Sequence, residues 1–296
     1  MIKHLEQLVK LAKMKPLSRL AVAQAADKDV LSAIVYAKNQ GIADALLVGD
    51  GRKIATLLTL MGEKAENYQI IEADTDEKCA YEAVRLIREG RADILMKGLL
   101  STSTLMRAVV DKTYGLRTGE LISHTMFYEV PAYEKLLCVT DGGMNTFPDF
   151  EKKEKILKNA VRVCKKLGYE RPVCACVCGA ENVDPKIQST LDARDLSLSE
   201  ELKKEGAVVF GPVGLDLAVS REACAHKGYS AEGAGSADIL LVPTYEVGNG
   251  IGKAMTYFGG AKSAGIIVGA RVPIVLVSRA DSAESKLYSI ALAALV

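Results

Sequence analysis

The chain has 296 residues, of which 49% are hydrophobic and 25% are charged, and its formal net charge is +1. This ordinary globular balance excludes a disordered, collagen-like or purely coiled-coil chain. The near-neutral charge argues against nucleic acid as a partner, because nucleic-acid-binding proteins usually carry a basic excess. No membrane partner is expected either, since the most apolar stretch, residues 264–277, is interrupted by Arg271 and Pro273.

Residues 1–15 predict an amphipathic helix rather than a secretory signal, because their apolar residues recur at helical spacing without an apolar core. The chain has seven cysteines, an odd number, which favours reduced thiols and a cytoplasmic location. Cys174, Cys176 and Cys178 alternate along one predicted strand and lack the CxxC spacing of zinc sites. We therefore expect buried small side chains there and no metal site.

Short β-rich runs alternate with helical patterns along the first third of the chain. Strands are predicted at 19–24, 45–48, 69–71 and 93–96, and helices at 29–39, 52–61, 76–89 and 103–110. This alternation predicts βαβ units and a parallel sheet covered on both faces.

The pattern changes at residues 114–131, which are richer in turns and polar residues. Further strands are predicted at 135–140, 173–177, 208–210, 239–242 and 273–277, with helices at 149–167, 198–205 and 282–293. Because one sheet of so many parallel strands is unusual, two α/β lobes are expected.

Several familiar catalytic motifs are absent from the sequence. The segment GNGIGKA (248–254) has Val247 and Ala254 where a P-loop needs Gly and Ser/Thr, and Lys253 where a dinucleotide fingerprint needs its third Gly. There are three histidines, none of them paired with a nucleophile in sequence, and there is no GxSxG motif. Any catalysis is therefore expected to use Arg, Lys, Ser, Asn and carboxylates.

The first candidate segment is DILMKGLLSTSTLMRAV (93–109), in which a strand ends at Lys97 and Gly98 and a helix starts within residues 101–104. Gly98 allows close approach of a ligand to the backbone, and a helix N-terminus capped by Ser or Thr favours an anion. Lys97 and Arg107 add positive charge. An ordinary capped helix with a solvated arginine would show the same pattern.

The second candidate is PIVLVSRADSAESK (273–286), where an apolar strand leads into Ser278, Arg279 and Asp281. At the carboxyl end of a strand these residues offer a hydroxyl, a bidentate anion fork and a carboxylate. A charge pair at a helix N-terminus is the structural alternative. Two more segments complete the set: VTDGGMNTFPD (139–149), and the glycine-rich stretch 211–255, which we expect to form loops around a ligand.

These four segments, in this order, resemble the phosphate acetyltransferase and phosphate butyryltransferase family over nearly the whole chain. The most specific matches are Gly211, Pro212, Asp216, Lys227, Ser230, the strand 237–243, Gly248, Asn249, Lys253, Ser278 and Arg279. The short chain, the MKGLL loop and the C-terminal sequence are most similar to the butyryltransferase branch.

The resemblance implies two doubly wound, three-layer α/β lobes with mostly parallel sheets, the second inserted into the first, with an active cleft between them. Lobe I is placed at residues 1–120 and 266–296, and lobe II at 121–265. A homodimer is implied as well. The implied reaction converts butyryl-CoA, or a related acyl-CoA, and phosphate into acyl phosphate and coenzyme A, with no permanently bound cofactor.

The resemblance also implies roles for individual residues. Arg107 and Arg279 would hold phosphate, Ser278 would contact the CoA sulfur, and Asp281, with Glu284 as second choice, would be the base. The acetyl branch has an aspartate seven positions after its serine, where this chain has Ser285, and its arginine lies one residue further from the loop glycine than Arg107 does from Gly98. The residues expected to bind substrate are Lys97, Gly98, Ser101, Thr102, Asn145, Asp216, Lys227, Ser230, Gly248, Asn249 and Lys253.

Three alternatives stay open at this point. The chain could be a phosphate acetyltransferase, a non-catalytic acyl-CoA-sensing domain of the kind fused to malic enzymes, or a dehydrogenase of similar two-lobe architecture, because a fold alone does not fix a function.

Overall fold

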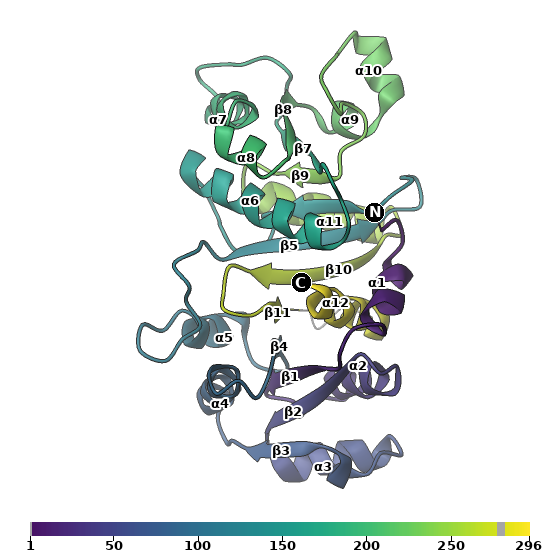
Figure 1. The fold of residues 1–296 in the computed structure, drawn as a ribbon, viewed down its shortest axis with the longest axis vertical. Helices are drawn as coiled ribbons and strands as arrows, with labels where there is room; N and C mark the ends of the chain where they lie inside the picture. The colour runs from purple at the N-terminus through teal and green to yellow at the C-terminus, as the bar shows by residue number, and fades with distance from the viewer. Residues whose placement is uncertain (1, 277–281) are drawn as a thin grey trace. The chain divides into compact units, whose positions relative to one another are not determined.

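The protein is described here from a computed structural model covering residues 2–276 and 282–296, and it has the mostly parallel α/β architecture expected from the sequence (Figure 1). It divides into two compact units, which we call the terminal unit (Glu6–Glu120 and Ala264–Val296) and the central unit (Met1–Leu5 and Leu121–Ser263). The first residues join the central unit because the Tyr169 hydroxyl donates to the Ile2 carbonyl at 2.8 Å and Glu129 accepts the Leu5 amide at 2.8 Å.

Parallel strands form the middle of the terminal unit. Their order is β3-β2-β1-β4-β11, and β10 lies antiparallel to β11. Within the sheet, Ala23 of β1 is level with Val48 of β2 and Lys97 of β4, so these three strands end side by side. The bounds are β1 Ser18–Ala23, β2 Ala43–Gly49, β3 Gln69–Glu72, β4 Ile94–Lys97, β10 Lys262–Val268 and β11 Ile274–Val275.

Helices connect these strands and begin at side-chain caps. Asp27, Asp50, Thr75 and Ser101 each accept a backbone amide at the start of α2, α3, α4 and α5. The bounds are α1 Leu5–Ala12, α2 Lys28–Asn39, α3 Gly51–Leu60, η1 Ala65–Asn67, α4 Asp76–Arg88, α5 Thr102–Val109 and α12 Ala283–Leu295. None of the described helices is long and apolar enough to span a membrane.

The order of the strands creates a switch point between β1 and β4. The chain runs outward from β1 through α2 to β2 and β3, and returns through α4 to β4 on the other side of β1. Right-handed crossovers therefore place α2 and α4 on opposite faces, and α2 packs against α12 while α4 packs against α5. In open α/β sheets, ligands bind at the carboxyl ends of strands at such a point.

The central unit has the strand order β5-β6-β9-β7-β8, in which β5 is antiparallel to β6 and the other neighbours are parallel. The sequence prediction of turns at 114–131 was wrong for β5, whose residues alternate between buried and half-buried positions along most of the strand. The core of this unit includes Tyr128, Val139, Phe210 and Leu240. The bounds are β5 Ser123–Glu129, β6 Leu137–Thr140, β7 Val173–Val177, β8 Val208–Val213 and β9 Ile239–Leu241.

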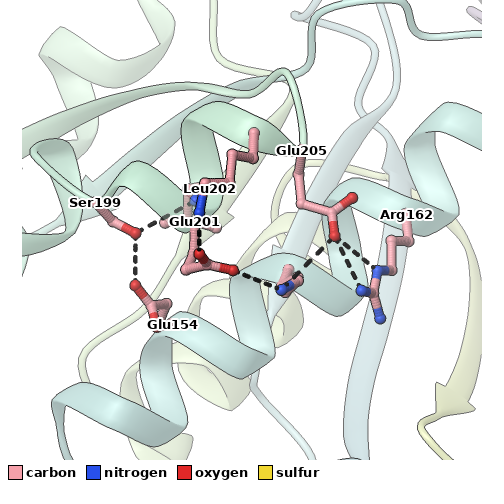
Figure 2. Close-up of polar contacts among 8 residues, drawn as sticks. Glu154, Arg162, Ser199, Glu201, Leu202 and Glu205 are labelled. Atoms are coloured by element: carbon pink, nitrogen blue, oxygen red, sulfur yellow. Dashed lines mark hydrogen bonds and ion pairs between the residues drawn. The ribbon is translucent and has the colours of Figure 1, made fainter.

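Helix α8 (Glu200–Lys204) is fastened to α6 (Phe150–Lys166) by a network of polar contacts (Figure 2). Ser199 caps α8 and donates its hydroxyl to Glu154 at 2.5 Å, while Glu205 accepts from Arg162 at 2.9 Å. Lys158 reaches Glu201 at 3.4 Å. Arg162 and Glu201 are exposed and the other groups are half-buried, so the network combines solvent-screened ion pairs with more protected hydrogen bonds.

About half of the glycine-rich stretch 211–255 is helical, which corrects the prediction that it forms ligand-wrapping loops. It contains α9 (Leu215–Val219), α10 (Arg221–Lys227) and most of α11 (Tyr245–Tyr257), and α7 (Gln188–Ser197) was not predicted either. A Cβ at Gly252 would lie 2.1 Å from the Tyr128 hydroxyl, and one at Gly248 would lie 2.7 Å from the Gly142 Cα. These two glycines therefore serve close packing of α11.

Candidate active site

Lys97 lies at the carboxyl end of β4, at the switch point, and only 6% of its surface is exposed. Its ammonium group donates to the carbonyls of Gly98 and Leu100 at 3.1 and 3.2 Å. These two hydrogen bonds from the Lys97 ammonium stabilise the turn that leads into α5. Lysine is a compact donor with three hydrogen-bonding positions, which suits it to hold several carbonyls at once.

Gly98 follows in the same turn and lies against the end of β1. A Cβ at this position would be 2.1 Å from the Gln24 carbonyl oxygen and 2.6 Å from that of Ala23. The close approach that the sequence assigned to a ligand is thus made, at least in part, by the neighbouring strand. Gly98 itself donates its amide to the Ala23 carbonyl at 2.8 Å.

The N-terminus of α5 is rich in hydroxyl groups. Ser101 accepts the Thr104 amide at 3.0 Å and shares hydrogen bonds with the Ser103 and Thr104 hydroxyls at 2.8 and 2.9 Å. Thr102 is the first residue of the helix and is exposed. A helix end of this kind attracts anions through its dipole and amide groups.

Arg107 lies in the last turn of α5 rather than at its start. It lies six positions after Ser101, or roughly 9 Å along the axis at about 1.5 Å per residue. Its side chain is exposed, and within the described part of the chain no carboxylate pairs with it. It shares a helix face with Ser103, four residues earlier, so its positive charge is available on the same side as that hydroxyl.

In the central unit, Asn145 belongs to a loop organised by Asp141. The Asp141 carboxylate is 2% exposed and accepts the amides of Gly143 and Met144, both at 2.8 Å. The Asn145 amide group donates to the same carboxylate at 2.7 Å and to the Ile122 carbonyl at 3.0 Å. The nitrogen of Asn145 is therefore used inside the loop, and its carbonyl oxygen is the atom that remains for a substrate.

This loop meets the start of α11. Gly248 is buried against Gly142, and the Tyr245 amide donates to the Thr146 carbonyl at 3.1 Å. The structure thereby brings Asn145, Gly248 and Asn249 into one neighbourhood. Lys253 follows Asn249 by one helical turn, is exposed, and has no carboxylate partner in the described residues.

Asp216 and Lys227 are brought together by α9 and α10. The Lys227 ammonium contacts Asp216 at 3.0 Å and Glu181 at 2.9 Å, and half of its side chain is exposed. Hydrogen bonds to Glu181 and then Asp216 raise the pKa of Lys227, and Lys227 in turn lowers the pKa of both carboxyl groups. Ser230, which is exposed, lies three residues after Lys227.

Sequence reasoning missed Asp141, Glu181 and Gln24. The signal for Asp141 was present, because Asp-Gly-Gly directly after a strand is typical of a turn closed by the aspartate side chain. No local signal marks Glu181, whose partners are far away in sequence. Gln24 is the residue that contacts the Gly98 turn.

The C-terminal candidates are only partly within the described structure. Ser278, Arg279 and Asp281 lie outside the described residues. Glu284 lies in the exposed first turn of α12 and accepts the Tyr288 hydroxyl at 2.8 Å.

Comparison with known proteins gives a consistent result. The phosphate acetyl/butaryl transferase family matches residues 54–294. A phosphate butyryltransferase of Clostridium acetobutylicum is 44% identical over 297 residues, covering 100% of this chain and 99% of the relative. A phosphate acetyltransferase of Thermotoga maritima is 38% identical over 291 residues, covering 98% of each chain.

A solved structure agrees with the sequence comparison. The crystal structure of a branched-chain phosphotransacylase from Enterococcus faecalis V583 superposes with a TM-score of 0.84 at 35% identity, covering 94% of this chain and 98% of that one. The resemblance inferred from the motifs is confirmed. The chain belongs to the phosphate acetyl/butaryl transferase family.

Proposed function

We propose that this protein transfers a short acyl group reversibly between coenzyme A and inorganic phosphate, with butyryl-CoA or a branched relative as acyl donor. The observation that carries the proposal is the 44% identity, over the full length, to a protein named phosphate butyryltransferase. The similarity to a branched-chain phosphotransacylase supports a branched acyl group. The 38% identity to a phosphate acetyltransferase keeps acetyl-CoA as the alternative donor.

The reaction sets clear chemical demands. A phosphate oxygen attacks the carbonyl carbon of the thioester, the carbon–sulfur bond breaks, and the thiolate leaves and takes up a proton. Phosphate is strongly hydrated, so it must be held and aligned before it can react. The developing negative charges on the carbonyl oxygen and the sulfur must be stabilised. In reverse, the CoA thiol, with a pKa near 8.5, must give its proton to a base.

The residues are assigned to these demands as follows. Arg107 and Arg279 hold phosphate, and Arg107 suits this role because it is exposed and has no carboxylate partner in the described structure. Ser278 donates to the CoA sulfur, and Asp281 is the base in preference to Glu284, which is already hydrogen-bonded to Tyr288. Substrate binding is assigned to Lys97, Gly98, Ser101, Thr102, Asn145, Asp216, Lys227, Ser230, Gly248, Asn249 and Lys253.

The proposal extends to the setting of the reaction. Coenzyme A, its acyl esters and phosphate act as substrates, and no permanently bound cofactor is required by the chemistry. A homodimer in the cytoplasm that takes part in butanoate metabolism is the context we propose, which size-exclusion chromatography with light scattering and cell fractionation would test.

The central experiment measures phosphate-dependent release of CoA thiol from acetyl-, butyryl- and isobutyryl-CoA. Release that is fastest with the four-carbon donors supports the proposal, and a preference for acetyl-CoA supports the acetyltransferase alternative. Binding of CoA without any release would identify a sensing domain instead. Arg279→Lys is expected to stay folded and lose most activity, because lysine lacks the planar fork of arginine.

A further inference from the structure

Gln24, directly after β1, has an unusual backbone conformation. Its φ angle is +57°, which makes it the one non-glycine residue with positive φ in residues 2–276 and 282–296. Glycine is the usual residue in this left-handed region, since any side chain there is strained. Strain of this kind tends to be kept where the surrounding structure needs it, often at functional sites.

The strained residue Gln24 lies where three neighbouring strands of the terminal unit end. Because Ala23 is level with Val48 and Lys97, Gln24 lies between Gly49 and Gly98 at the carboxyl ends of three neighbouring strands. This is the switch point of the terminal unit, and Gly98 starts the turn that leads into α5. A Cβ on Gly49 would lie 2.8 Å from the Gln24 Oε1 atom, so both neighbouring positions are kept open by glycine.

The backbone of Gln24 fixes the turn before α5. Its carbonyl oxygen accepts the Leu99 amide at 2.8 Å, next to the bond from the Gly98 amide to the Ala23 carbonyl at 2.8 Å. The left-handed conformation both ends β1 and directs this carbonyl toward the turn. The Lys97 ammonium braces the same turn through the Gly98 and Leu100 carbonyls.

The side chain of Gln24 explains why the position holds glutamine rather than glycine. Its Nε2 atom donates to the Asp76 carboxylate at 3.3 Å, in the first turn of α4, and α4 packs against α5. Gln24 is half-buried. Its side chain connects the end of β1 to α4, and its carbonyl connects the end of β1 to the turn before α5. Glycine would relieve the strain but would lose the tie.

We infer that Gln24 is a positioning residue for the proposed acyl transfer, one that locks the 97–101 turn in the geometry that presents the N-terminus of α5 to the anionic substrate. The inference rests on the proposed function for its kinetic consequence. Its structural part, the locking of the turn by Gln24 and Asp76, stands on geometry alone.

Two substitutions separate the side-chain lock from the backbone conformation. Gln24→Gly keeps access to positive φ and removes the side chain, and Asp76→Ala removes only the acceptor. We expect each to lower kcat/KM for phosphate about five- to tenfold, the size of one lost hydrogen bond. Tm should stay unchanged or rise in Gln24→Gly, because the strain is relieved. The double variant should fall no further than either single variant, since both remove the same contact.

Two matched variants distinguish loss of the Gln24–Asp76 hydrogen bond from a general loss of structure. Glu77→Ala removes the neighbouring exposed charge from the same helical turn and is expected to leave kcat/KM unchanged. Asp76→Asn keeps an oxygen acceptor of the same length and should recover most of the activity lost in Asp76→Ala. Wild-type kcat/KM in Gln24→Gly, or a loss of activity that follows a fall in Tm, would overturn the inference.

Amide hydrogen exchange tests the lock without reference to activity. Peptides covering residues 97–101 should exchange about tenfold faster in Gln24→Gly and Asp76→Ala than in the wild type, while peptides from the middle of β1 and β4 stay protected. If the wild type releases no CoA thiol, the proposed function fails, and the exchange result alone decides whether Gln24 holds the turn. Unchanged exchange would refute the lock.

Discussion

Replacing Gly98 by alanine tests whether the turn after β4 is set by contact with β1. A Cβ at Gly98 would lie 2.1 Å from the Gln24 carbonyl oxygen, 2.6 Å from the Ala23 carbonyl oxygen and 2.7 Å from the Gln24 carbonyl carbon. All three are backbone atoms at, or directly after, the end of β1, a strand that is paired on both sides, so they cannot swing away as a flexible side chain would. The turn must move by roughly 1 Å to restore ordinary contact distances.

The magnitude follows from what that movement breaks. The Gly98 and Leu99 amides both donate to β1 at 2.8 Å, and each such bond contributes about 1 kcal/mol net. Overpacking adds about 1–3 kcal/mol, and the lower chain entropy of alanine in the unfolded state returns up to about 1 kcal/mol. We expect the free energy of unfolding to fall by about 2–4 kcal/mol, or roughly 3–6 °C in Tm.

Urea unfolding followed by circular dichroism measures this loss, with Gly250→Ala as the matched control. Gly250 lies in α11, and a Cβ there meets no atom within 4 Å, so the same chemical change should stabilise the protein by up to about 1 kcal/mol. Equal stability of Gly98→Ala and the wild type would refute the argument, because it would mean that the backbone at the end of β1 can move to accommodate a Cβ atom without a loss of stability.

Three further outcomes are expected. Lys153→Met removes the ammonium group that lies 2.6 Å from the buried Asp192 carboxylate. Because the carboxylate loses its ion-pair partner, the free energy of unfolding measured in urea should fall by about 3–5 kcal/mol. Arg107→Gln should keep the wild-type Tm, because the side chain is exposed, yet lower kcat/KM for phosphate about a hundredfold; an unchanged value would contradict its assignment to phosphate. Hydrogen bonds from Arg19 hold the pKa of Asp93 below its ordinary value, so this exposed pair adds a small stability above about pH 4 that is lost as pH falls through the lowered pKa. Arg19→Gln should therefore raise that pKa in an NMR titration, and its stability deficit should vanish in acid.

Most elements of the terminal unit were predicted to within about two residues because their signals are local, although β10 was not predicted and α1 is shorter than the helix expected at 1–15. Capping residues such as Asp27 and Thr75 precede helices, and the strands are unbroken apolar runs. Strand β5 was hidden because its first half, Ser123–Thr125, is polar in sequence although two of these three residues are fully buried. That burial comes from tertiary packing, which periodicity does not report.

The glycines of α11 show a second limit of sequence reasoning. Glycine has low helix propensity, so Gly248, Gly250 and Gly252 within five residues predict a loop. The helix forms because two of these glycines let it approach Gly142 and Tyr128 more closely than any side chain would allow. Those partners lie more than a hundred residues earlier, so no local pattern could reveal them. Gly248 and Gly252 therefore serve close packing of the helix rather than a loop.

The sequence could predict which types of residue form the candidate site, but not which of its basic side chains are already paired with carboxylates. From the sequence, Lys227 and Arg107 are equivalent basic residues. In the structure, however, Lys227 contacts two carboxylates, those of Glu181 and Asp216. A phosphate dianion that approached Lys227 would have to displace them or bind beside two negative charges, whereas Arg107 has no such competitor in the described structure. Lys227 thus connects α10 to α9 through Asp216, whereas the Arg107 side chain forms no such ion pair in the described structure. The distinction depends on Glu181, 46 positions from Lys227, and becomes visible only once the chain is folded.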